Sequence, residues 1–188
     1  MTSVHARAAT PEGVELAPFD PESRVALEWK QPRAWTAEHE LTDGTHVFAR
    51  IATTGWLAHR MSIAFAHASW DVRVTAFGDL VVDGSEGRDA EPYLRHRRGF
   101  WSGKMQRRGL PTLRTRSGGF WRPWWELRDP EDQPLLHLDT HHGFLRTSAD
   151  LVVLDAARAL PDLPALIGLS MLVLLAAQRQ RAHAAAHS

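Results

Sequence analysis

The chain has 188 residues, 44% of them hydrophobic, and its 22 Lys and Arg residues are balanced by 22 Asp and Glu residues. This length fits one domain, and the zero net charge excludes a strong overall attraction to nucleic acid or to a membrane. The chain has no cysteine, which excludes disulfides, thiolate metal sites, cysteine nucleophiles and palmitoyl anchors. The same absence fits a reducing compartment, so we expect a cytoplasmic protein.

The N-terminal part of the chain predicts a flexible segment followed by a β-hairpin. Residues 1–23 lack the apolar core of a signal peptide, and we expect the fold to begin near Arg24. The pair Asp43-Gly44 predicts a two-residue type I′ turn, because that turn requires positive φ. Strands are predicted before and after it over 25–30, 34–41 and 46–51.

Short strands continue to about residue 154. In the segment from Trp70 to Ala76, for example, apolar and polar residues alternate with the period of two that is typical of a half-buried strand. The further candidates are 56–66, 70–76, 80–82, 91–98, a stretch around Phe100 to Met105, 110–116, 120–128, 135–142 and 144–154. Ten to twelve strands therefore precede any long helix.

A helix is predicted at about 162–181, with the last residues, 183–188, frayed. Its central run from Ala165 to Ala177 has no polar face, so the helix must be surrounded on all sides. Thirteen residues are too few for a bilayer, which needs about 20. Asp162 is expected to cap the first turn. The pattern predicts one domain over 24–182, a closed antiparallel β-barrel of about twelve strands around a buried hydrophobic C-terminal helix.

Two segments in this order resemble the Tubby C-terminal-like superfamily, which includes phospholipid scramblases and LURP-one-related proteins. They are FWRPWWELRDPEDQPLLHLDTHHGFLRTSADLVVLD at 120–155 and LPDLPALIGLSMLVLLAAQRQR at 160–181. The resemblance implies a twelve-stranded barrel around a hydrophobic helix over roughly 25–181. Tubby domains bind phosphoinositide headgroups through basic residues on the barrel exterior. The lack of cysteine excludes the acylated attachment of scramblases, and no functional residue of the family is matched by a motif.

The strongest local feature is a window without Asp or Glu from Pro92 to Trp125. Arginine suits bidentate recognition of phosphate, so this window predicts a site for an anionic ligand or a lipid headgroup. The alternative is that these side chains are solvent-facing and paired across strands with acidic residues of 71–91. The candidate ligand-binding residues are Arg95, Arg97, Arg98, Lys104, Arg107, Arg108, Arg114, Arg116 and Arg122.

A second cluster consists of His137, Asp139 and His141, which alternate along one predicted strand. Residues two apart share a face, so the three side chains are weak candidates for metal ligands. Their spacing is about 7 Å per pair, so three could reach one metal only with a bulge. The alternative is that they are outer-face residues beside inward-facing Leu136 and Leu138.

The leading hypothesis is a non-enzymatic binding or scaffold module with no cofactor, at the membrane periphery or in the cytoplasm. Its partner would be an anionic phospholipid headgroup or another protein, with no transmembrane span and no specific nucleic acid binding. One alternative is a lipocalin-like carrier of a small hydrophobic ligand or cofactor, and another is a metal-dependent enzyme using the His/Asp cluster. The chain contains no nucleophile elbow, phosphate loop or dinucleotide-binding glycine pattern.

Overall fold

The computed structural model describes residues 15–33, 36, 38–54, 60–75, 78–83, 93–98, 102–119, 123–142 and 147–186. These residues form twelve strands and two helices. The strands are β1 (Leu27–Lys30), β2 (His39–Thr42), β3 (Val47–Thr54), β4 (Arg60–Phe65), β5 (Ala68–Val74), β6 (Leu80–Val82), β7 (Leu94–Arg98), β8 (Ser102–Arg107), β9 (Leu110–Gly118), β10 (Trp124–Arg128), β11 (Pro134–His142) and β12 (Thr147–Val153). The helices are α1 (Asp155–Arg158) and α2 (Leu163–Ala186).

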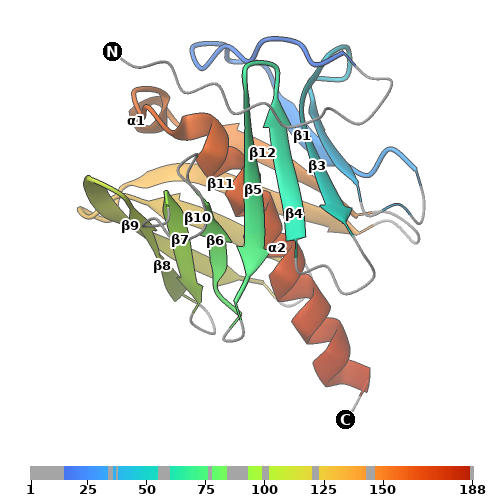
Figure 1. Ribbon diagram of the computed structural model, residues 1–188, viewed down its shortest axis with the longest axis vertical. Helices are drawn as coiled ribbons and strands as arrows, with labels where there is room; N and C mark the ends of the chain where they lie inside the picture. Colours follow the sequence, from blue (N-terminus) through green and yellow to red (C-terminus); the bar gives the residue numbers. More distant parts are fainter. Residues whose placement is uncertain are drawn as a thin grey trace.

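The strands form a closed antiparallel barrel, as predicted (Figure 1). Each strand pairs with its neighbour in the sequence, and β1 pairs with β12 so that Leu27 lies opposite Leu151. Closure gives every strand a partner on both sides, which removes the exposed edges that would recruit another chain.

Apolar and polar residues alternate along the strands, and this alternation separates the inner face of the barrel from its outer face. In β4, Met61, Ile63 and Phe65 are buried, whereas Arg60 is exposed. The inward residues of the other strands join the same core, which includes the fully buried Trp29 and Leu127. The alternation thus places polar side chains on the outer surface, where a ligand could reach them.

The helix α2 fills the interior of this barrel. Residues 165–175 are at most 9% exposed, and all of them except Gly168 and Ser170 belong to the same core cluster as the inward-facing strand residues. The helix approaches both β4 and β10, which are six positions apart in the ring of twelve strands and therefore lie opposite each other. Figure 1 shows α2 passing behind β4 and β5 before it emerges at the lower end. Strands on all sides thus bury a helix that has no polar face.

The predicted hairpin between β2 and β3 is present, but its turn is not the predicted two-residue one. Thr42 lies opposite Val47, so four residues connect the paired positions. Within this turn only Gly44 has a positive φ, of 94°. The Asp43 carboxylate instead supports the turn by accepting hydrogen bonds from the backbone N–H groups of Thr45 (2.8 Å) and His46 (2.7 Å).

The N-terminal segment contacts the barrel before the predicted start at Arg24. The N–H of Ala17 donates to the carbonyl of Val47 at 2.8 Å, and the Phe19 ring packs edge-on against Phe48. Phe19 also meets Phe65 at a centroid distance of 5.8 Å. From the other end of the chain, Arg158 donates to the carbonyl of Ser23 at 2.8 Å. Residues 15–26 therefore lie as a strap across one end of the barrel.

The C-terminal part differs from the prediction in two places. A one-turn helix, α1, lies between β12 and α2, where no helix was expected. The helix α2 continues to Ala186, past the predicted end near Arg181 and into the segment predicted to fray. Some predicted strand residues, among them 34, 56–59, 120–122 and 144–146, lie outside the described residues.

Candidate functional site

Three cations of the acid-free window form a row across the outside of the barrel. Arg97 in β7 lies directly opposite Lys104 in β8, and Lys104 lies directly opposite Arg114 in β9. All three side chains are exposed. Neighbouring strands are about 4.8 Å apart, so the row concentrates three positive charges within roughly 10 Å. We call Arg97, Lys104 and Arg114 the basic row.

A shallow hollow of about 430 Å³ lies over the basic row. Besides these three residues, its lining includes Ser102 and Arg116. The remaining lining residues are Gly103 and Thr115, which face each other across β8 and β9. These small residues could not be predicted as part of a site, because their place in the hollow depends on the register of the strands.

Gly103 supports the floor of this hollow by having no side chain. A Cβ at this position would lie 2.6 Å from Thr115 Oγ1 and 2.8 Å from His96 Nε2. Those two atoms are 3.1 Å apart and share a buried hydrogen bond. Glycine is therefore required here by close packing, since any larger residue would disrupt the contact beneath the basic row.

No carboxylate of the described residues forms an ion pair with the basic row. Among the acidic residues of 71–91 that the structure describes, Asp83 pairs with Arg73 at 3.0 Å and none pairs with the basic row, whereas Glu86, Asp89 and Glu91 lie outside the described residues. Like charges directly opposite each other across strands are destabilising. Such an arrangement is expected where a surface binds an anion, because the ligand supplies the missing negative charge.

Arg107 is not part of an outer anion site, contrary to prediction. Its side chain is only 4% exposed, and its Nη1 atom donates to Asp162 Oδ1 at 3.1 Å, while its Nε donates to the carbonyl of Pro111 at 2.9 Å. The Asp162 carboxylate thus anchors the start of α2 to β8, and the Asp162 carbonyl accepts the N–H of Leu166. Burial raises the pKa of the neighbouring Tyr93, and the negative charge of Asp162 adds to this effect.

Arg116 lines the hollow, but its charge is already compensated. Its Nη2 atom lies 2.9 Å from Asp132 Oδ2. Asp132 also lies 3.5 Å from Arg128, which in turn contacts Glu126 at 2.7 Å. The hydrogen bond that Arg128 donates to Glu126 raises the pKa of Arg128. Arg116 is therefore a paired outer-face charge, although its partner is Asp132 and not one of the acidic residues of 71–91.

The other arginines of the predicted site have different positions. Arg95 in β7 is half-buried and lies opposite Gln106, with its Nε atom enclosed. Arg108 is exposed in the turn between β8 and β9. Arg98 occupies the end of β7 opposite Gly103. Arg122 lies outside the described residues.

The three candidate metal ligands face outward as expected, but they do not form one cluster. His137 Nδ1 lies 3.1 Å from Glu126 and its Nε2 lies 3.1 Å from Asp139, while its ring stacks on Trp124. His141 instead contacts Asp150 of β12 at 2.7 Å. Within the described ranges, no group of three His, Asp or Glu side chains could hold a metal ion.

The interior of the barrel offers little room for the carrier alternative. The positions that would face a ligand are filled by α2, where Leu166, Ile167 and Leu169 are completely buried.

No helix of the described chain is both long enough and apolar enough to cross a membrane. Comparison of the sequence and the structure with protein-family models, with curated proteins and with solved structures yields no match.

Proposed function

We propose that this barrel is a non-enzymatic binding module whose basic row recognises an anionic ligand or a phospholipid headgroup. The observation that carries the proposal is the alignment of Arg97, Lys104 and Arg114 over an open hollow, with no ion-pair partner among the described residues. Guanidinium and ammonium groups on adjacent strands can donate several hydrogen bonds to the oxygens of one phosphate or of two neighbouring phosphates.

The proposal includes a relationship with Tubby-like barrels, which the sequence resembles in the order of its strands and its apolar helix. In those proteins basic residues on the barrel exterior bind phosphoinositide headgroups. A cytoplasmic protein with such a face would work at the membrane periphery, because anionic lipids attract clustered basic residues.

The distribution of charge supports a directed contact with an anionic surface. Asp150 in β12 lies opposite Asp139 in β11 and opposite Glu28 in β1, which makes a row of three carboxylates. In the ring, β12 is four positions from β8, so the two rows lie on different parts of the barrel wall. Although the net charge of the chain is zero, the basic row and the row of carboxylates carry opposite charges at separate places. Only the basic row is attracted to a negative surface.

Co-sedimentation with vesicles tests the proposal. We expect the protein to bind vesicles that contain an anionic phospholipid more tightly than neutral vesicles, with weaker binding at high salt. The triple variant Arg97→Ala, Lys104→Ala, Arg114→Ala should bind anionic vesicles about 100-fold more weakly, at about 1 kcal/mol per basic residue. Soluble inorganic phosphate and pyrophosphate should compete for the same residues.

A matched control removes the same charge elsewhere. Arg24, Arg33 and Arg60 are exposed and lie outside the hollow, so their replacement by Ala should leave most of the binding intact. Equal binding to anionic and neutral vesicles would contradict the proposal, as would an equal loss in both triple variants.

A further inference from the structure

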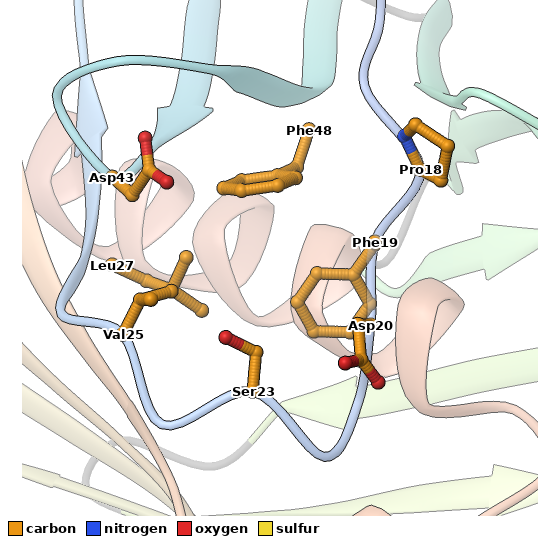
Figure 2. A pocket seen from close by; sticks show the side chains of 8 residues that line it. All are labelled: Pro18, Phe19, Asp20, Ser23, Val25, Leu27, Asp43 and Phe48. Atoms are coloured by element: carbon orange, nitrogen blue, oxygen red, sulfur yellow. The ribbon is translucent and has the colours of Figure 1, made fainter.

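A second hollow, of about 110 Å³, is lined by residues of the N-terminal part of the chain and lies between the strap and the β2–β3 turn (Figure 2). Its lining is mainly apolar and aromatic, with two carboxylates and one hydroxyl. The lining residues are Pro18, Phe19, Asp20, Ser23, Val25, Leu27, Asp43 and Phe48. Since a water molecule takes about 30 Å³, the hollow has room for a group of about four heavy atoms.

The aromatic walls of this hollow present a π-face to a ligand. Figure 2 shows the Phe48 ring almost edge-on to the viewer, with one face turned across the hollow toward Leu27 and Ser23. The Phe19 ring closes a second side at 76° to Phe48, with the ring centroids 6.1 Å apart. The face of an aromatic ring is electronegative, and it attracts a cation placed over it.

The carboxylate of Asp43 supplies negative charge beside the Phe48 ring. It comes from the β2–β3 turn and is 16% exposed. Hydrogen bonds from the backbone N–H groups of His46 and Thr45 lower the pKa of Asp43 from 3.8 to about 2, so the group is ionised at neutral pH. Asp20 lies on the other side of the hollow in Figure 2. In the part of the chain that the structure describes, no Lys or Arg lines this hollow.

The hydrogen bonding of Asp43 favours an alkylated ammonium over a primary one. One carboxylate oxygen, Oδ1, already accepts two backbone N–H groups, and the other, Oδ2, is 3.3 Å from His46 Nδ1. A primary ammonium has three donors that lose their bonds to water on entry, and the apolar wall replaces few of them. A trimethylated, quaternary ammonium has no N–H donors, and its methyl groups fit against Val25 and Leu27.

We propose that the hollow between the strap and the β2–β3 turn is a binding site for a small methylated ammonium group, held by the Phe48 face and the Asp43 carboxylate. The strap completes the site, because Phe19 and Ser23 come from it. This site is separate from the basic row and is independent of the proposed anion binding.

Isothermal titration of the full chain with three probes tests this proposal. Choline, ethanolamine and 3,3-dimethyl-1-butanol share a hydroxyethyl tail and carry a trimethylammonium, a primary ammonium and a neutral tert-butyl head, respectively. We expect choline to bind at least tenfold more tightly than either of the others. Saturation-transfer NMR should show contact between the choline methyl groups and phenylalanine ring protons.

Two variants locate the site. Phe48→Leu keeps an apolar side chain but removes the ring, and Asp43→Asn removes the charge at constant size. Each should weaken choline binding at least fivefold, whereas Asp71→Asn, an exposed carboxylate on β5, should leave it unchanged. Equal affinity for choline and the neutral alcohol in the unmodified chain would overturn the proposal, and this comparison does not depend on the folding of any variant. No detectable choline binding, or unchanged binding in both variants, would overturn it as well.

Discussion

Arginines from one stretch of sequence have different environments in this protein. Arg107 is enclosed and bonded to Asp162, which is 55 residues away in the chain. Arg116 is paired at the surface with Asp132, and its side chain is 49% exposed. The composition of the window does not distinguish these two residues from Arg97 or Arg114, which form no ion pair with any acidic residue that the structure describes. Burial and partners decide which arginine stabilises the fold and which can bind a ligand.

This difference predicts losses of stability of different size for two similar substitutions. Arg107→Ala leaves the buried Asp162 carboxylate without its partner, so we expect the free energy of unfolding to fall by about 3 kcal/mol or more. Arg116→Ala breaks an exposed pair and should cost less than about 1 kcal/mol. Urea unfolding followed by tryptophan fluorescence measures both values. Similar losses in the two variants would contradict the assignment of Arg107 to the interior.

Replacement of the whole buried pair gives a further comparison. Arg107→Met combined with Asp162→Leu removes both charges and keeps apolar volume, so this double variant should be more stable than Arg107→Ala alone. A double variant as unstable as the single one would mean that the Asp162 carboxylate has another essential contact.

At the scale of elements, the contact between α2 and β4 depends on Gly168. A Cβ on Gly168 would lie 2.4 Å from Ile63 Cγ2 and 2.9 Å from Ile63 Cδ1. The helix therefore approaches β4 more closely than a larger residue would permit. In an exposed helix a change from glycine to alanine stabilises by about 1 kcal/mol, so here packing opposes intrinsic propensity.

Because packing and helix propensity oppose each other at Gly168, we expect Gly168→Ala to raise or lower the stability according to the side chain at position 63. Gly168→Ala should destabilise the otherwise unmodified protein by about 1 kcal/mol, because overpacking exceeds the gain in propensity. In an Ile63→Ala background the same change should be stabilising, since the methyl group then fills vacated space. Thermal unfolding of the four proteins measures the cycle. The same sign in both backgrounds would show that Gly168 does not pack on Ile63.

At the scale of the whole molecule, the barrel and α2 should depend on each other. A chain that ends at Pro161 lacks α2, and inward-facing residues such as Ile63 and Leu127 lose the apolar surface that covers them. We expect this chain to unfold or aggregate, with loss of the β signal in circular dichroism and rapid proteolysis. A chain that ends at residue 182 keeps all of residues 165–175 and should retain the unfolding temperature of the full chain. A stable barrel without α2 would contradict the role of the helix as the core.

Much of this architecture could be predicted from the sequence because it depends on local patterns. Alternation in segments such as Arg60 to Phe65 identifies strands, and the run from Ala165 to Ala177 identifies a helix that must be surrounded. The type of the β2–β3 turn was predicted less well, because the Asp43 side chain bonds to the backbone in a way that competes with the two-residue turn. Helix α1 is a single turn and has no periodicity to detect.

The sequence by itself determined the class of fold, the inward and outward faces of most strands and the window in which cations gather. Only the tertiary structure decided which of those cations are unpaired, because pairing depends on register across strands and on partners such as Asp162 and Asp132. The same is true of the hollow beneath the strap, since Phe19 and Phe48 meet there only when the barrel has closed. Patterns of hydropathy act over a few residues, whereas a binding site is assembled from segments that meet on folding.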